Sequence, residues 1–128
     1  MNIEHVALWV SDLERTRAFY ETYSGATAGP KYTNAAKGFE SYFLSFRSGG
    51  ARLELMRRSG LPPRPPGAEH TGWAHLAFSV GSVERVDALT ARLRSDGYEV
   101  VDGPRRTGDG YYESVVLDPE GNRVEVTA

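Results

Sequence analysis

The sequence predicts an α+β fold in which two tandem βαβββ modules form an open, eight-stranded, barrel-like cup with its helices outside. The first observation is an internal repeat, in which residues 4–10 align with residues 74–80 at an offset of 70, from His5 to His75. The second is that a helix start follows each of these strands. The third is that Arg52-Leu53-Glu54-Leu55 aligns with Arg123-Val124-Glu125-Val126 at an offset of 71. A repeat of this length indicates two copies of one supersecondary unit.

In the first module, residues 4–10 alternate apolar and polar side chains as a strand does. Asp12 is a suitable N-cap for a helix from Leu13 to about Tyr23, and Gly25 is a suitable stop signal. Further strands follow, and the last two cover residues 42–46 and 52–55, on either side of the turn Ser48-Gly49-Gly50.

The second module repeats this order. Ser82 is the expected N-cap of a helix from Val83 to about Ser95, which Gly97 ends. Residues 113–117 align with residues 42–46 at an offset of 71, and the turn Pro119-Glu120-Gly121 leads into the last strand.

The length of 128 residues predicts one domain. We assign residues 1–58 to the first module, 59–70 to a connector and 71–128 to the second module. Leu61-Pro62-Pro63-Arg64-Pro65-Pro66 favours neither helix nor central strand, and it predicts a stiff, polyproline-like connector. Recognition of its Pro-Pro pairs by a partner is the alternative. His70 has no counterpart in the repeat, so we expect it to be exposed.

The composition excludes several classes of function. The chain has no cysteine, which excludes disulfides, thiolate metal sites and cysteine nucleophiles, and fits a reducing compartment. The net charge of −2, without a basic run, gives no nucleic-acid footprint. No apolar run approaches the roughly 18 residues of a membrane span, and no basic-then-apolar signal segment precedes the first strand. We therefore expect no nucleic-acid or membrane partner, and a cytoplasmic location.

The parity of four strands points to a metal site. Alternate side chains of a strand share a face, and in each of these strands a His or Glu lies opposite the apolar face that a helix would cover. Alone, each of these residues would be an ordinary surface side chain, but the same types recur at matching positions. Clustered carboxylates repel, and a divalent cation offsets that repulsion. The expected ligands of one ion, Ni, Zn, Co, Mn or Fe, are His5, Glu54, His75 and Glu125.

The sequence resembles the vicinal oxygen chelate superfamily, which includes glyoxalase I, bleomycin- and fosfomycin-resistance proteins, methylmalonyl-CoA epimerase and extradiol dioxygenases. Four segments over the whole chain carry the resemblance: residues 5–13, 18–20, 72–80 and 117–126. The motifs are highly specific for the fold and less so for the reaction. The family resemblance implies a small-molecule substrate and, in many relatives, a homodimer.

The ligand set favours a glyoxalase I-like protein within the superfamily. Bacterial glyoxalase I has His, Glu, His and Glu at the four strand positions, as here. Epimerases typically have Gln where this chain has Glu54, dioxygenases and fosfomycin thiol transferases use two His and one Glu, and drug-sequestering members usually lack the ligands. The resemblance therefore implies a lactoylglutathione lyase-like metalloenzyme, acting on a small α-hydroxycarbonyl or thiol-conjugate substrate through an enediolate.

The resemblance also implies the residue roles. Glu125 would be the catalytic general base, which loosens its metal bond and moves a proton between adjacent carbons, while Glu54 would remain a ligand. The glutathione-binding loops of glyoxalases are not recognisable, so the thiol stays open. Residues that share the ligands' parity and are expected to line a substrate pocket are Trp9, Arg52, Met56, Trp73 and Arg123. For the two arginines, pairing with nearby carboxylates is an equal alternative.

Two other functions compete with this one. A bleomycin-resistance-like protein would sequester a drug or natural product, and another metal-dependent member, such as an epimerase or a dioxygenase, would use the same fold for different chemistry. The modules either close on each other within one chain or swap across a homodimer, in which His5 and Glu54 come from one subunit and His75 and Glu125 from the other.

Overall fold

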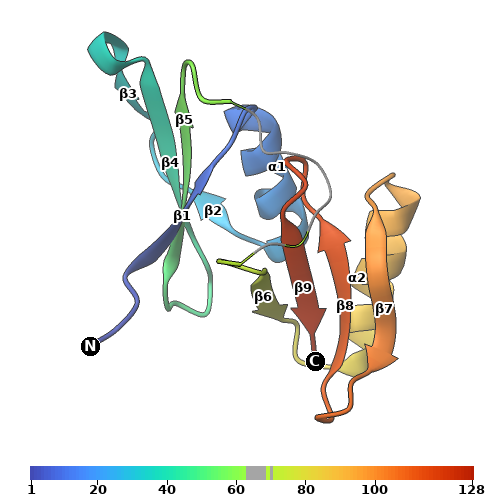
Figure 1. Cartoon of the computed structure of the whole chain (residues 1–128). Coiled ribbons are helices and arrows are strands. Elements are labelled where there is room, and N and C mark those ends of the chain that lie inside the picture. The colour runs from blue at the N-terminus through green and yellow to red at the C-terminus, as the bar shows by residue number, and fades with distance from the viewer. Residues whose placement is uncertain (63–68, 70) are drawn as a thin grey trace. The chain divides into compact units, whose positions relative to one another are not determined.

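The computed structural model describes residues 1–62, 69 and 71–128. The chain divides into two compact units, Met1–Arg64 and Pro65–Ala128. Each unit has its own sheet and its own α-helix (Figure 1). The α+β class and the predicted βαβββ order are confirmed. The predicted connector conformation and the exposure of His70 fall on residues 63–68 and 70, which lie outside the described residues.

The first unit contains β1 (His5–Trp9), α1 (Leu13–Ser24), β2 (Thr27–Ala28), β3 (Tyr32–Asn34), the short 3₁₀ helix η1 (Ala35–Lys37), β4 (Phe39–Ser45) and β5 (Arg52–Arg58). Its strands lie in the order β1-β5-β4-β2, and β3 also pairs with β4. The β1–β5 pair is parallel and the others are antiparallel. The first strand of the module therefore lies beside its last strand.

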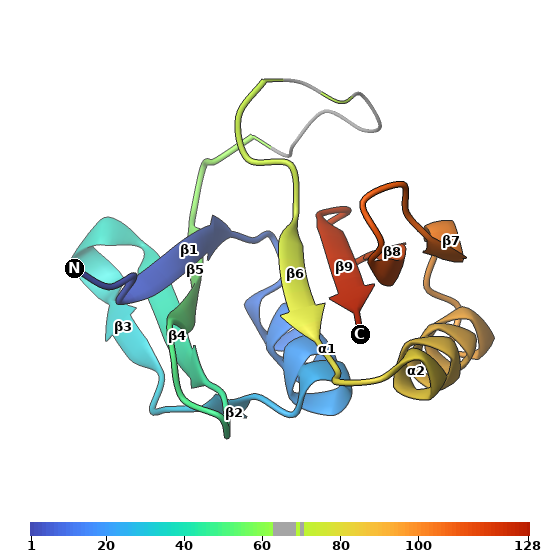
Figure 2. The same cartoon turned by 90° about the horizontal axis from the view of Figure 1, so that it is seen from below.

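The second unit contains β6 (Leu76–Ser79), α2 (Val83–Ser95), β7 (Val100–Arg106), β8 (Tyr112–Leu117) and β9 (Arg123–Thr127). Figure 2 shows its strands in the order β6-β9-β8-β7. Again the first strand is parallel to the last, and the remaining pairs are antiparallel. This parallel neighbour relation is what places each predicted His beside a predicted Glu.

Both predicted helix starts are confirmed. The Asp12 side chain accepts a hydrogen bond from the Arg15 amide at 2.9 Å, and the Ser82 hydroxyl accepts one from the Arg85 amide at 3.3 Å. These caps satisfy amides that have no partner inside the helix. Gly25 ends α1 in the left-handed conformation, at a φ of 67°, which glycine adopts without steric cost.

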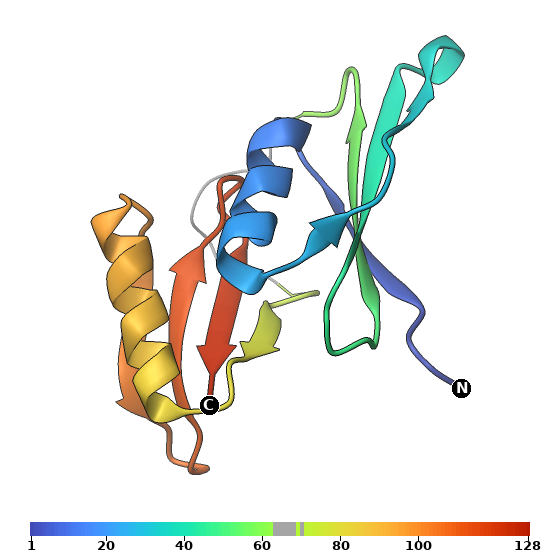
Figure 3. The same cartoon turned by 180° about the vertical axis from the view of Figure 1, so that it is seen from behind.

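One face of each sheet forms the core against the helix of the same unit. In the first unit α1 packs on β5 and β4, and in the second α2 packs on β8, β7 and β9 (Figure 3). The inward positions of the closing strands are buried, with Leu55 0% and Val126 2% exposed. Burial of such a side chain contributes roughly 1.5–3 kcal/mol. The other buried residues of these interfaces include Phe19, Tyr20, Leu53, Val86, Leu93 and Val124.

The strand that follows α1 is interrupted, so the described residues form nine strands where eight were predicted. β2 ends at Ala28, and the Gly29 amide still donates to the Phe43 carbonyl at 2.9 Å. Pro30 follows, and it has no amide hydrogen with which to continue the ladder. Pairing resumes at Tyr32, opposite Ser41.

The register corrects one detail of the predicted repeat. Phe43 lies opposite Glu54 in β4–β5, and Val115 lies opposite Glu125 in β8–β9. Equivalent positions in these two strands therefore differ by 72 residues, from Phe43 to Val115, and the predicted offset of 71 is wrong there. A slip of one residue exchanges the two faces of a strand, so Ser41, and not Tyr42, is the counterpart of Glu113.

Neither of the helices in the described part of the chain is long and apolar enough to cross a lipid bilayer.

Candidate functional site

The first His/Glu pair lies on the face of its sheet that α1 leaves uncovered. His5 begins β1 and Glu54 is the third residue of β5, where Ala7 is its parallel neighbour. The small Ala7 side chain leaves the space between the two longer ones free. The Nε2 atom of His5 lies 3.8 Å from Oε2 of Glu54, and their side chains are 39% and 14% exposed.

The second pair repeats this arrangement in its own unit. His75 directly precedes β6, and Glu125 lies beside Ala77 in the parallel β6–β9 register. The Nε2 atom of His75 lies 3.4 Å from Oε2 of Glu125, with side-chain exposures of 42% and 15%. Each unit therefore presents an imidazole nitrogen and a carboxylate oxygen that converge, with the carboxylate as the more buried of the two.

Each unit by itself supplies two of the four predicted metal ligands. Within the described residues, no group of three or more His, Cys, Asp or Glu side chains is arranged to hold a metal ion. The donor types are those that divalent transition metals accept. That all four residues bind one ion stays a prediction.

A side chain that the sequence analysis missed orients His5. The Glu4 carboxylate bonds Nδ1 of His5 through one oxygen and the Arg52 guanidinium through the other. The hydrogen bond to His5 and, to a smaller extent, that to Arg52 lower the pKa of Glu4. Because adjacent residues of a strand point to opposite faces, parity gave no reason to expect this contact. Glu4 precedes the strand and is free of that constraint.

Glu113 is a second missed residue. It lies opposite Thr127 in β8–β9, one step along from Glu125 on the same face. Burial, and then the charge and hydrogen bond of Glu125, raise the pKa of Glu113. The predicted offset of 71 had matched Glu113 with Tyr42, which bonds Glu14 of α1. With the observed register the carboxyl group belongs to the Glu125 face.

The predicted pocket residues fall into two groups. Trp9 is 48% and Trp73 82% exposed, and Met56 lies on the same face of β5 as Glu54. Each arginine instead pairs with a carboxylate. Arg52 bonds Glu4, and Arg123 lies 3.0 Å from Glu69.

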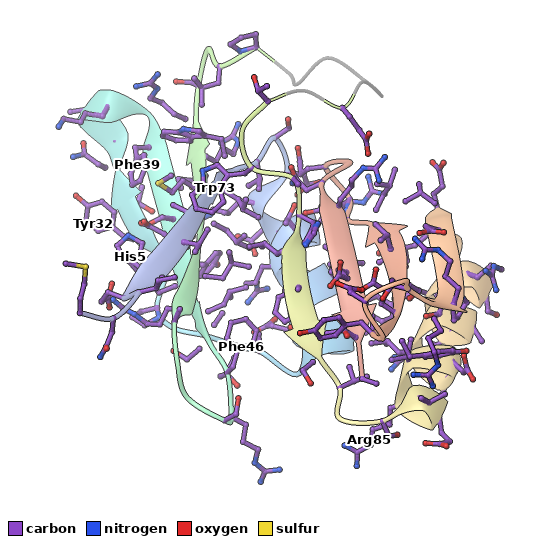
Figure 4. All side chains as sticks on the ribbon, turned by 60° about the horizontal axis from the view of Figure 1, so that its bottom comes forward. His5, Tyr32, Phe39, Phe46, Trp73 and Arg85 are labelled. Atoms are coloured by element: carbon purple, nitrogen blue, oxygen red, sulfur yellow. The ribbon has the colours of Figure 1, made fainter. Side chains whose placement is uncertain are left out.

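The open face of the first sheet is rich in aromatic side chains. The rings of Trp9 and Phe39 make a T-shaped contact with their centres 6.1 Å apart, and the centres of the Phe39 and Tyr32 rings are 6.0 Å apart. The Arg58 guanidinium lies 5.4 Å from the centre of the Trp9 ring. Figure 4 shows His5 on β1, with Tyr32 and Phe39 on the β3–β4 hairpin of the same unit. This face therefore offers flat apolar surface and a cation alongside the side chains of His5 and Glu54.

The corresponding face of the second sheet is charged instead. Besides Glu125 and Glu113 it includes Asp102, which pairs in register with Val115 and holds Arg105 at 2.5 Å. This contact lowers the pKa of Asp102. The repeated framework thus presents one mainly aromatic and one mainly ionic surface.

One family model matches nearly the whole chain, and the chain also has curated relatives of similar length. The family model described as Glyoxalase/Bleomycin resistance protein/Dioxygenase superfamily matches residues 2–126. The chain is 28% identical over 130 residues to the uncharacterized protein YqjT of Bacillus subtilis, covering 98% of each. It is 30% identical over 125 residues to the uncharacterized protein PA2024 of Pseudomonas aeruginosa, covering 96% of this chain and 85% of that protein.

Solved structures show the same fold. A glyoxalase family protein from Enterococcus faecalis is 28% identical with a TM-score of 0.79, over 98% of this chain and 96% of that one. The trypanothione-dependent glyoxalase I of Leishmania major has a TM-score of 0.79 at 22% identity, over 99% of this chain and 86% of that one, a likeness of fold alone. This chain belongs to the Glyoxalase/Bleomycin resistance protein/Dioxygenase superfamily.

Proposed function

We propose that this chain is a glyoxalase I-like lyase or isomerase that depends on one divalent metal ion and acts on a small α-hydroxycarbonyl or thiol-conjugate substrate. The observation that carries the proposal is the repeated convergence of His Nε2 and Glu Oε2, at 3.8 Å in one unit and 3.4 Å in the other. Packing of the repeat does not require a His/Glu pair on the uncovered face of each sheet, whereas binding of one cation by both pairs does.

The residues present fit a divalent ion. Two donors that each lie about 2.1 Å from one cation are about 3.0–3.4 Å apart at coordination angles of about 90–110°. The His75–Glu125 separation falls within this range, and the His5–Glu54 separation lies a few tenths of an ångström beyond it. His5, Glu54, His75 and Glu125 would hold the ion. When bound, it would supply Lewis-acid stabilisation of negative charge on the substrate oxygens.

Glu125 is the proposed general base. Its carboxylate would accept the proton from the carbon beside the carbonyl and return it to the adjacent carbon, so that atoms and electrons balance without an external oxidant. Its neighbour Glu113 lies on the same face of the sheet, where burial and the charge of Glu125 raise the pKa of Glu113. Glu54 would hold its place as a ligand.

The exposed aromatic surface would receive the non-reacting part of the substrate. Trp9, Met56 and Phe39 supply apolar area, and Arg58 supplies a positive charge above the Trp9 ring. We expect an apolar or planar substituent there, with the reacting oxygens at the His5–Glu54 end of the face.

Metal analysis and turnover together test this function. Purified protein is expected to carry one divalent ion per site and to convert methylglyoxal with at least one of a panel of low-molecular-weight thiols. No stoichiometric ion after loading with Ni, Zn, Co, Mn or Fe would reject the proposal. A bound ion without turnover of any conjugate would reject the glyoxalase reaction and favour an epimerase- or dioxygenase-like member.

Sequestration of a planar drug or natural product is a second candidate, which the half-exposed Trp9 favours. A bound ligand of this kind would quench the fluorescence of Trp9, and the protein would release it unchanged. Ligand binding that is unaffected by removal of the metal, without turnover, would support this candidate over the enzyme.

The proposed setting is a cytoplasmic homodimer with a small-molecule substrate. The absence of cysteine fits a reducing compartment. Light scattering tests the dimer, and mixing two variants tests how it is built. One variant lacks the His5–Glu54 pair and the other lacks the His75–Glu125 pair. If the modules swap between subunits, random mixing restores about a quarter of the sites, whereas closure within one chain restores none.

A further inference from the structure

The two metal-binding histidines are held differently, although the repeat places them at equivalent positions. Nδ1 of His5 is bonded to Glu4, whose second oxygen is bonded to Arg52. The imidazole also makes a T-shaped contact with the Phe43 ring, with the ring centres 5.3 Å apart and the ring planes at 86°. Arg52 lies over the same ring, 4.1 Å from its centre. His5, Glu4, Arg52 and Phe43 thus form a closed cluster that extends across β1, β5 and β4.

The backbone fixes this cluster in place. The Arg52 amide donates to the Glu4 carbonyl at 3.0 Å, and Arg52 is the parallel register partner of His5. Glu4 precedes β1, so its side chain is able to turn back onto the imidazole that follows it. Phe43 comes from β4 and lies opposite Glu54. Three segments distant in sequence therefore act on one ring.

We propose that Glu4 is a positioning residue that fixes His5 as its Nδ1–H tautomer and leaves the lone pair of Nε2 directed toward Glu54. An ionised carboxylate only accepts hydrogen bonds, so the neutral imidazole beside it must carry its proton on Nδ1. Arg52 holds the carboxylate in place through its guanidinium. This proposal deepens the proposed function, because a bare Nε2 is what a metal ion requires of a histidine.

One consequence concerns the gap between His5 and Glu54. With Nδ1 protonated, the bare Nε2 faces a carboxylate oxygen at 3.8 Å, and two acceptors without hydrogen between them repel. A cation between them removes that repulsion. The first unit is therefore preorganised for a cation, and not for a direct hydrogen bond between its own two side chains.

The second unit lacks this device. At the position equivalent to Glu4 the chain has Ala74, which carries no carboxylate. The arginine equivalent to Arg52 is Arg123, which pairs instead with Glu69 at 3.0 Å. Among the described residues, none bonds Nδ1 of His75. Within the described residues, no carboxylate therefore fixes the proton of His75 on Nδ1, and its Nε2 atom lies 3.4 Å from Oε2 of Glu125.

The role of Glu4 is orientation and not stability. Its side chain is 63% exposed, and exposed ion pairs typically contribute little to folding. A Glu4→Ala variant is therefore expected to fold, which leaves the tautomer of His5 open to measurement. Glu69→Ala is the matched control, because it removes a similarly exposed carboxylate from the equivalent arginine.

The test uses metal-free protein labelled with ¹⁵N in histidine, at about pH 8, where an ordinary imidazole is neutral. Long-range ¹H–¹⁵N spectra report which ring nitrogen carries the proton, and single substitution of each histidine assigns the signals. His5 is expected to be mainly Nδ1–H in the unmodified chain and mainly Nε2–H in Glu4→Ala. Glu69→Ala is expected to leave His5 unchanged, and Glu4→Gln, whose amide oxygen still accepts, to restore part of the Nδ1–H form.

Metal affinity provides the second readout. Zn²⁺ or Co²⁺ competition with a chromophoric chelator is expected to show a loss of about 10–100-fold in Glu4→Ala and no loss in Glu69→Ala. A His5 tautomer that is already Nε2–H in the unmodified chain, or that Glu4→Ala leaves unchanged, overturns this proposal whatever the metal does. If the unmodified chain binds no metal while Glu4→Ala still changes the tautomer, the proposed function fails and the role of Glu4 stands.

Discussion

Replacement of Glu125 by Gln separates the proposed base from a merely structural carboxylate. Gln has nearly the same shape as Glu, and the Glu125 side chain is only 15% exposed, so the amide fills the same space. The backbone pairing with Val115 does not depend on the side chain. We therefore expect a folded protein in which one proton acceptor and one negative charge are missing.

The expected loss of activity is large. A positioned general base contributes about 10²–10⁴-fold to a proton transfer, or about 3–5 kcal/mol of transition-state stabilisation at about 1.4 kcal/mol per tenfold. The loss is expected in kcat more than in KM, because the proton moves only in the transition state. Folding is not expected to suffer, since the substitution removes the charge that disfavours ionisation of Glu113.

The assay compares kcat and metal content of the unmodified chain with those of Glu125→Gln and the matched variant Glu54→Gln. The Glu54 side chain is buried to a similar extent, with 14% of it exposed, and it lies at the equivalent position of the other unit. We expect Glu54→Gln to lose metal affinity and to recover part of its activity at high metal concentration, and Glu125→Gln to stay inactive when fully loaded. Activity of loaded Glu125→Gln within tenfold of the unmodified chain would refute its role as the base.

Three further outcomes follow from the same structure. Burial and the charge of Glu125 raise the pKa of Glu113. Between the ordinary carboxyl pKa and this raised pKa, Glu113 is protonated in the folded state and ionised in the unfolded state. The free energy of unfolding of the metal-free protein is therefore expected to fall as the pH rises through this interval. Urea unfolding between about pH 4 and 8 should show this slope, and Glu113→Gln should reduce it; an unchanged slope would contradict the assignment. Trp9→Ala is expected to raise KM for substrates with an aromatic substituent and to leave KM for methylglyoxal nearly unchanged, in steady-state kinetics with both; equal effects would place Trp9 outside the substrate site. Leu55→Ala, at a position that is 0% exposed, is expected to lower the free energy of unfolding by about 2–5 kcal/mol. A loss below about 1 kcal/mol would show that the surrounding core relaxes to fill the cavity.

Strand parity predicted the pairs because it depends only on the two-residue period of a strand. In β5 and β9 single glutamates alternate with aliphatic residues, so the face of each was determined as soon as the strands were recognised. The structure confirms that Leu53 and Leu55 are buried and that Glu54 is on the other side. Whether both pairs share one ion depends on how two units meet, about which the period of a strand carries no information.

Parity failed where the sequence has no alternation. Tyr42-Phe43-Leu44 and Val115-Val116-Leu117 are continuous apolar runs, so shifting one against the other by a residue leaves the pattern almost unchanged. The resulting slip aligned Glu113 with the helix-facing Tyr42, so the alignment gave no reason to expect a contact between Glu113 and Glu125. A fully buried Ser114, whose hydroxyl bonds Thr90 of α2 at 2.6 Å, marks the correct helix-facing position. A small polar residue within an apolar run was the available signal.

The two modules share the strand pairing that brings each His close to a Glu, but the side chains around the two pairs differ. In each module the first and last strands pair in parallel, so that the Glu lies beside an alanine and close to the His two residues before that alanine. The neighbours of these pairs are set by side chains alone, and they have diverged. Glu4 and Phe43 hold one imidazole, while Glu113 lies against the other carboxylate. The repeated backbone therefore determines which two donors converge in each unit, and the side chains around each pair determine how those donors are held.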